Sequence, residues 1–265
     1  MTRAVPVTKL HGTQNDFVLI DERIARVADY QTFARLVCDR HAGVGADGLL
    51  VALPSVSADV RMRILNADGS EAEMCGNGIR CLARYLHDAG AVEGLRVETV
   101  SGIIATQVLL RHQRPYDVRV NLGVPRIETV AEVEDALFVW VGNPHVVIFP
   151  SKLDDVDLDI VGPELAAKIP GGANVHACVR VGPRQLSVRH FERGVGKTLA
   201  CGTGAVAAAA AARVRGDVQC PVEVTVPGGS LLVEWDGSGD AFLTGPAVRV
   251  FDTQIDVPDA VLVAA

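Results

Sequence analysis

Two segments of the chain, Asn66-Ala-Asp-Gly-Ser-Glu-Ala-Glu-Met-Cys-Gly-Asn-Gly78 and Glu192-Arg-Gly-Val-Gly-Lys-Thr-Leu-Ala-Cys-Gly-Thr-Gly204, share one pattern. Each places a polar residue nine positions before a Cys-Gly-x-Gly sequence. The segments align without a gap at an offset of 126 residues, and the same offset places Arg63 on Arg189. An internal repeat of this kind predicts two structurally related halves, each carrying one specialised cysteine.

Each of these cysteines directly precedes a predicted helix, at about residues 77–87 and 203–215. The first backbone N–H groups of a helix have no partner within it, and they form the positive end of the helix dipole. This environment stabilises a thiolate, so we expect a lowered cysteine pKa, and the same N–H groups can hold a carboxylate. A tight turn beside a buried thiol would explain either segment alone. Two matched copies favour a pair of acid/base groups that invert a carbon centre.

The remainder of the chain favours an α+β fold. Short segments with alternating apolar and polar residues, typical of half-buried strands, surround the two helices, and further helices are predicted near residues 30–40 and 164–169. We expect a first half at residues 1–122 and a second at 123–253, with a C-terminal tail from about 254 to 265 that packs back on the first half. The site is expected in the cleft between the halves.

Composition narrows the function classes. The 265 residues are 49% hydrophobic and carry a formal net charge of -7, which provides no basic surface for nucleic acid or an anionic membrane. Residues 1–9 contain no apolar signal core, and no apolar run is long enough to span a bilayer. The six cysteines have irregular spacing and no CxxC pair, which argues against a disulfide framework or a metal site. We therefore expect a cytoplasmic protein with reduced thiols and no metal.

The two cysteine segments resemble the signature segments of the diaminopimelate epimerase family. Residues 11–18, 43–50, 142–145 and 172–175 match other blocks of that family in the same order. The resemblance implies conversion of LL-2,6-diaminopimelate to the meso form without pyridoxal phosphate or another cofactor, in lysine and cell-wall precursor synthesis. It also implies two pseudo-symmetric domains, each a barrel-like, mainly antiparallel sheet around a central helix, and a homodimer whose only other partner is the small-molecule substrate.

The resemblance also assigns roles by position. Cys75 and Cys201 become the acid/base pair, with Cys201 accepting the proton in the LL-to-meso direction and Cys75 donating one. His145 and Glu192 become catalytic neighbours of the thiols. Backbone N–H groups at the two helix starts would bind the reacting carboxylate, and Arg193 with several asparagines would bind the distal end of the substrate. The substrate-binding residues implied in this way are Asn15, Gly48, Asn66, Gly76, Asn77, Asn143, Asn174, Glu192, Arg193, Gly202 and Thr203.

Three positions depart from the pattern that the resemblance implies. Gly48 stands where some members carry a glutamine, and Lys197 replaces a common glutamate in the second signature. His176 stands where an acidic or apolar residue is more usual. None of these changes removes an acid/base group, but Lys197 is expected to alter the electrostatic potential near Cys201.

Other functions are compatible with parts of the pattern. Proline or hydroxyproline racemases of the same architecture also use two cysteines, but their first motif tends to read Cys-Gly-His, and Asn77 fills that place here. A thiol–disulfide enzyme is expected to carry a CxxC pair, and a non-catalytic binding protein has no need of both thiols. The distal-end asparagines and Arg193 favour a substrate with a second amino acid terminus.

Overall fold

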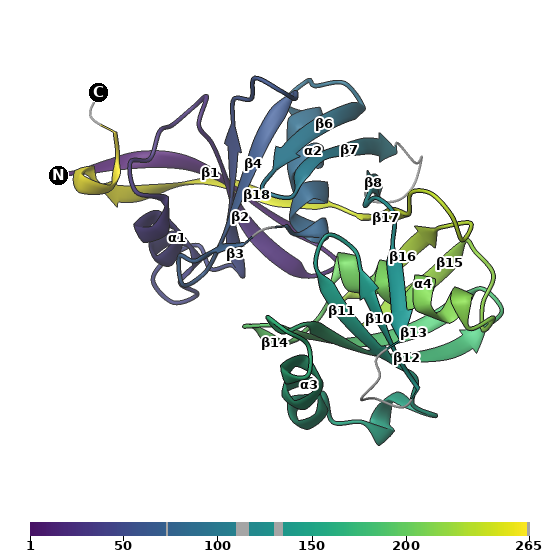
Figure 1. Ribbon diagram of the computed structural model, residues 1–265. Helices are drawn as coiled ribbons and strands as arrows, with labels where there is room; N and C mark the ends of the chain where they lie inside the picture. The colour runs from purple at the N-terminus through teal and green to yellow at the C-terminus, as the bar shows by residue number, and fades with distance from the viewer. Residues whose placement is uncertain (73, 110–116, 130–134, 264–265) are drawn as a thin grey trace. The chain divides into compact units, whose positions relative to one another are not determined.

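The chain forms two compact units in the computed structural model, which describes residues 1–72, 74–109, 117–129 and 135–263 (Figure 1). The first unit is Met1–Val120 with Pro246–Ala265, and the second is Asn121–Gly245. The chain returns to the first unit at Pro246, earlier than the expected residue 254. The reason is that β18 (Val248–Pro258) pairs antiparallel with β1 (Thr2–Gly12) along nearly its whole length.

The first unit is one strongly curved, mostly antiparallel sheet. Its strands follow the order β18-β1-β2-β3-β4-β6-β7-β8, with β5 added beside β4. Strands near opposite ends of this order, β1, β18 and β7, all contact the helix α2, so the sheet wraps around that helix. The further elements are β2 (Asn15–Asp21), α1 (Tyr30–Cys38), β3 (Gly48–Leu53), β4 (Val60–Asn66), β5 (Glu71–Ala72), α2 (Gly76–Asp88), β6 (Gly94–Thr99), β7 (Gly102–Leu109), β8 (Asp117–Asn121) and the short 3-10 helix η2 (Asp259–Val261).

The second unit repeats this topology. Its strand order is β9-β10-β11-β12-β13-β15-β16-β17, with β14 beside β13, and its parallel and antiparallel pairings follow the same succession as in the first unit. The elements are β9 (Arg126–Thr129), β10 (Ala136–Trp140), β11 (Pro144–Ile148), η1 (Leu153–Asp155), α3 (Leu158–Ala167), β12 (Asn174–Gly182), β13 (Gln185–Glu192), β14 (Gly196–Thr198), α4 (Gly202–Val214), β15 (Val222–Val226), β16 (Gly229–Glu234) and β17 (Phe242–Pro246).

The central helices α2 and α4 correspond residue for residue at the offset of 126 that the sequence repeat predicts. Residues 202–212 of α4 are all buried, and its alanine run lets the strands β10–β13, β15 and β16 approach the helix closely on several sides. A helix that is apolar all round belongs in a core. The predicted pair of pseudo-symmetric, barrel-like α+β halves is therefore confirmed.

The helix predicted near residues 164–169 begins earlier, at Leu158. Asp157 caps it by accepting a hydrogen bond from the Asp159 backbone N–H, and the helix continues through Pro163. Residues 116–120 alternate apolar and polar side chains, which also predicts a strand. Residue 116 lies outside the described ranges, and β8 occupies the rest. No helix in the described ranges has the length and apolar character needed to cross a membrane.

Candidate active site

Cys75 lies directly before α2, as predicted. Its backbone is extended and it is the N-cap of the helix, where its Sγ accepts a hydrogen bond from the Gly78 backbone N–H at 3.4 Å. The thiol also donates to Oδ1 of Asn15 at 3.6 Å, and Nδ2 of Asn77 donates to the same oxygen at 3.1 Å. Three of the predicted site residues of the first unit therefore meet at one oxygen atom.

The buried guanidinium of Arg80 holds this cluster in place through hydrogen bonds. Arg80 is completely buried, and it donates to Oγ1 of Thr13 at 2.8 Å, to Oδ1 of Asn77 at 2.9 Å and to the Gly76 carbonyl at 3.0 Å. Burial lowers the pKa of Arg80, while negative charge on the neighbouring cysteines acts in the opposite direction. The sequence prediction gave Arg80 and Thr13 no role. The available signal was a charged residue among the apolar residues of a core helix.

Asn15 is held in place from its other side. Its Nδ2 donates to Oδ2 of Asp47 at 2.8 Å, and Arg40 donates to Oδ1 of Asp47 and to Asp16, both at 2.8 Å. The amide oxygen of Asn15 is thus turned toward Cys75 by a network of charged groups. Asp47 belongs to the block at residues 43–50, but the sequence prediction did not include it among the site residues.

Cys201 is the N-cap of α4, as predicted, but its titration differs from the expectation. The residue is 4% exposed, and its Sγ lies 3.6 Å from Oγ1 of Thr203. Burial raises the pKa of the Cys201 thiol well above its ordinary value, and the Glu192 carboxylate adds to this effect. Thr203 and the Gly204 N–H favour the thiolate but do not outweigh burial. The expected pKa lowering at the helix start is therefore wrong for Cys201, because desolvation dominates.

Glu192, Arg193 and Asn174 form a cluster in the second unit. Glu192 ends β13 and accepts a hydrogen bond from Oγ1 of Thr198 at 2.6 Å. The backbone N–H of Arg193 donates to Oδ1 of Asn174 at 2.9 Å, and the Arg193 guanidinium donates to the Gly171 carbonyl. Glu192 also lies in electrostatic contact with Cys201. Asn174 and Arg193, which share a predicted role, lie next to each other.

Asn143 and His145 also meet. His145 is fully buried on β11, and its Nε2 lies 2.7 Å from Oδ1 of Asn143. Burial lowers the pKa of His145 to about 3, so the imidazole is neutral near pH 7. Its Nδ1 lies 2.8 Å from Nε2 of His176, one of the positions that depart from the expected pattern.

Within each unit, the strand register places two predicted site residues opposite each other. Asn66 is the register partner of Gly48 on β3, and a Cβ on Gly48 would stand 2.7 Å from the Leu65 carbonyl oxygen, which explains the missing side chain. In the second unit, Glu192 and Asn174 occupy the positions of Asn66 and Gly48. Asn66 itself donates to Ser70 in a turn at 2.9 Å.

The charge of Lys197 is balanced by neighbouring carboxylates. Its Nζ lies 2.9 Å from Oδ1 of Asp157 and 2.7 Å from Oδ2 of Asp159, both at the start of α3. Lys197 is 49% exposed at its side chain. The expected effect of this departure on the potential near Cys201 is therefore reduced by two local counter-charges and by solvent.

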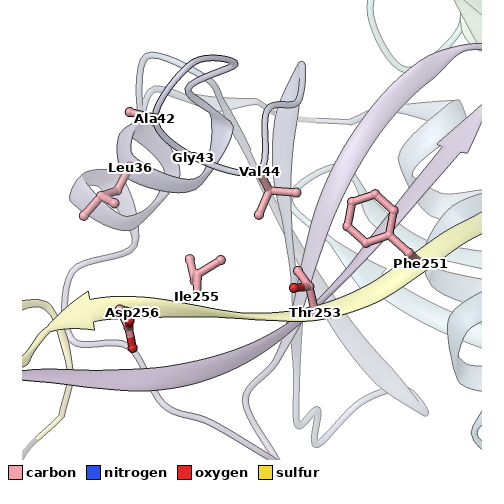
Figure 2. Close-up of a pocket in the computed structure, with 8 residues that line it drawn as sticks. All are labelled: Leu36, Ala42, Gly43, Val44, Phe251, Thr253, Ile255 and Asp256. Atoms are coloured by element: carbon pink, nitrogen blue, oxygen red, sulfur yellow. The ribbon is translucent and has the colours of Figure 1, made fainter.

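A groove elsewhere in the first unit does not belong to this site. It has a volume of about 560 Å³ and runs between α1, the loop after it and β18 (Figure 2). Its lining residues include none of the predicted site residues and are Leu36, Ala42, Gly43, Val44, Phe251, Thr253, Ile255 and Asp256. Across the described ranges, no three His, Cys, Asp or Glu side chains are grouped as metal ligands.

Comparison with known proteins agrees with the geometry. The family described as "Diaminopimelate epimerase" matches residues 7–128 and 137–250. The diaminopimelate epimerase of Desulforudis audaxviator is 44% identical over 270 residues, covering 92% of this chain and 97% of that protein. The diaminopimelate epimerase of Desulfitobacterium hafniense is 41% identical over 271 residues, covering 92% and 96%.

A solved structure extends the comparison to the fold. The hydroxyproline epimerase of Agrobacterium vitis, with bound trans-4-hydroxy-L-proline, has a TM-score of 0.71 and covers 98% of this chain and 97% of its own. Its sequence identity is 14%, so it shares the architecture alone. The matched repeat, the two cysteine-capped core helices and relatives above 40% identity over nearly the full length lead to one conclusion: the chain belongs to the diaminopimelate epimerase family.

Proposed function

We propose that this chain converts LL-2,6-diaminopimelate to meso-diaminopimelate by a two-base mechanism without pyridoxal phosphate, in lysine and cell-wall precursor biosynthesis. The observation that carries the proposal is the pair of equivalent cysteine N-caps on two core helices that share one topology. Membership of the family supports the substrate, because the matched relatives are diaminopimelate epimerases.

The local chemistry of the second unit supports the role of proton acceptor for Cys201. A buried thiol with a raised pKa must lose its proton before it can act as a base. The Glu192 carboxylate, in electrostatic contact with Cys201, is the group proposed to take that proton as substrate binds. The thiolate then removes the substrate α-proton, and the thiol is re-formed.

The local chemistry of the first unit supports the role of proton donor for Cys75. Its S–H donates to Oδ1 of Asn15, an acceptor that favours the protonated thiol. We place the Cys75 thiol on the opposite face of the same α-carbon. There it donates its proton to the carbanion and becomes a thiolate. The two cysteines exchange roles in the reverse direction.

The carbanion formed between these steps requires stabilisation. Preorganised donors on the reacting carboxylate supply it, and the backbone N–H groups of Gly76, Asn77, Gly202 and Thr203 are proposed for this role. The amides of Asn15, Asn66, Asn143 and Asn174 and the guanidinium of Arg193 are proposed to bind the distal amino acid end, with Gly48 leaving room beside it. A planar guanidinium can hold a carboxylate through two parallel hydrogen bonds.

The cellular setting follows from the same proposal. We propose a cytoplasmic homodimer that binds its small substrate and has no nucleic-acid or membrane partner. The formal net charge of -7 supports the last two points, because polyanions and anionic surfaces repel an acidic protein.

The test is an assay in heavy water under reducing conditions, without added cofactor. Starting from LL-diaminopimelate, early meso product is expected to carry deuterium at the inverted α-carbon, while recovered substrate stays mostly unlabelled and the distal α-carbon takes up no label. This result follows because the product face is protonated by a different thiol, which has exchanged with solvent.

Parallel assays with L-proline and trans-4-hydroxy-L-proline provide the specificity control. Inversion of either of these, without turnover of diaminopimelate, would overturn the proposed substrate. Early meso product that retains protium at the inverted centre would overturn the two-base mechanism instead.

A further inference from the structure

Three buried histidines of the second unit form a continuous hydrogen-bonded chain, here called the histidine chain: His145 on β11, His176 on β12 and His190 on β13. Nδ1 of His145 lies 2.8 Å from Nε2 of His176, and Nδ1 of His176 lies 2.8 Å from Nδ1 of His190. One end of the chain contacts Oδ1 of Asn143 at 2.7 Å. At the other end, Nε2 of His190 is buried and has no hydrogen-bond partner.

The first unit does without any such chain at the equivalent positions. Leu50 and Ile64 form the cross-strand pair of β3 and β4. The equivalent pair of β12 and β13 is His176 and His190. Phe17 on β2 occupies the position equivalent to His145 on β11. Phe17 is the register partner of the first residue of β3, and His145 is the register partner of the first residue of β12. Hydrocarbon side chains therefore fill these core positions in the first unit. Burying three imidazoles at the equivalent positions of the second unit requires a reason beyond packing.

The histidine chain also touches the start of α4. A Cβ on Gly204 would stand 2.4 Å from Cε1 of His176, so the imidazole ring lies directly against Gly204 in the first turn of α4. In the first unit, a Cβ on Gly78 would stand 2.9 Å from Cδ2 of Leu50. The last glycine of the second Cys-Gly-x-Gly segment thus admits His176 beside the catalytic helix start.

The two ends of the histidine chain decide which ring nitrogens carry protons. A neutral imidazole has one donor and one acceptor, so two arrangements satisfy the contacts between the three rings, and they run in opposite directions. Only one of them places an N–H on Nε2 of His145, as the Asn143 oxygen requires because it only accepts. One leaves a lone pair on Nε2 of His190, and the other leaves an N–H there. A buried N–H without a partner is the rarer defect in proteins. The favoured direction is therefore donation from His190 to His176, from His176 to His145, and from Nε2 of His145 to Asn143.

We propose that His176, supported by His190, is a positioning residue that holds His145 in its Nε2–H tautomer as a neutral hydrogen-bond donor beside Asn143. In the epimerisation proposed above, on which this inference rests, substrate binding would transfer that N–H from Oδ1 of Asn143 to negative charge that develops on the substrate. A base at the same nitrogen would need the opposite tautomer, so His145 is assigned as a donor and the proton transfers stay with the two thiols.

The tautomers can be measured without any activity assay. The full chain is labelled with ¹⁵N-histidine, its signals are assigned from single-histidine variants, and long-range ¹H–¹⁵N correlation at pH 7 reports the protonation of each ring nitrogen. We expect a proton on Nε2 and none on Nδ1 for His145 and His176, and the reverse for His190. A proton on Nδ1 of His145, or on both of its nitrogens, would overturn the proposal.

Two variants of His176 then test its effect on the reaction. His176→Leu installs the residue that the first unit carries at this place and removes the donor to His145. Its kcat for diaminopimelate is expected to fall roughly 10- to 100-fold at nearly unchanged KM, the size of effect that misplacing a reacting group produces. His176→Gln keeps an amide N–H and an oxygen, so it is expected to restore most of kcat and the Nε2–H tautomer.

The outcomes separate this inference from the proposed function. Full kcat in His176→Leu would overturn the positioning role, and so would an equal loss in both variants. If the wild-type chain shows the expected tautomers but no diaminopimelate turnover, the proposed function falls and the tautomer assignment stands.

Discussion

Acidification is expected to destabilise the second unit strongly, because the histidine chain is buried and neutral. Burial lowers the pKa of His145 and of His190 to about 3, and it lowers that of His176 well below its ordinary value. An unfolded histidine titrates near pH 6.5. Between these values the unfolded chain binds protons that the folded chain does not, so the free energy of unfolding falls as the pH falls.

The magnitude follows from the same comparison. For a histidine that stays neutral when folded, lowering the pH from 7 to 5 removes about 2 kcal/mol of unfolding free energy. The three residues of the histidine chain together account for about 6 kcal/mol, which is comparable to the whole stability of an ordinary domain.

The informative perturbation is His190→Ile, which installs the residue found at the equivalent position of the first unit, Ile64. The variant removes the unpartnered Nε2 of His190 but also removes the donor to Nδ1 of His176, so its unfolding free energy at pH 7 is expected to stay close to that of the wild type. Its loss of unfolding free energy between pH 7 and pH 5 is expected to be smaller by about 2 kcal/mol, because one buried histidine is gone.

Urea denaturation at both pH values provides the assay. The two tryptophans of the chain, Trp140 and Trp235, lie in the second unit, so their fluorescence reports its unfolding. Linear extrapolation yields the free energies. His41→Gln, which removes an exposed histidine of the first unit, is the control and is expected to leave the acid-induced loss unchanged. An equal acid-induced loss in His190→Ile and the wild type would refute the reasoning.

Two further predictions concern the helix starts. Cys75→Ala and Cys201→Ala are each expected to lower kcat for diaminopimelate roughly 10²- to 10⁴-fold, the range for a lost acid/base group, while Cys220→Ala retains turnover; near-normal turnover in either of the first two variants would contradict the two-base mechanism. Gly204→Ala is expected to lower the free energy of unfolding by about 1–3 kcal/mol in urea denaturation at pH 7, because the added Cβ would meet the His176 ring at 2.4 Å, and unchanged stability would contradict the close approach.

The sequence alone predicts the duplicated architecture and the location of both thiols. This was achievable because the decisive signals are contiguous. A Cys-Gly-x-Gly segment directly precedes each core helix, and helix starts, glycine turns and the alanine run of α4 depend on neighbouring residues. The C-terminal tail was expected to pack on the first half, but its long pairing with β1 and its start at Val248 escaped prediction because the two strands stand at opposite ends of the chain.

The supporting chemistry of the site was decided by tertiary structure. Arg80 becomes a buried support for Asn77 only because the sheet closes around α2 and removes its water. Cys201 has a raised pKa because packing desolvates the thiol more strongly than the helix start stabilises its anion.

The same distinction holds for His176. In the sequence it is a single departure from a family pattern, with nothing nearby to indicate its partners. The structure joins it to His145 and His190 because three separate strands place one nitrogen of each of these rings 2.8 Å from a nitrogen of His176. Local sequence therefore determined where the two thiols lie and where the core helices α2 and α4 begin. Only tertiary packing decided which groups are stripped of water and which buried polar atoms meet, because burial and cross-strand contact depend on residues far apart in the chain.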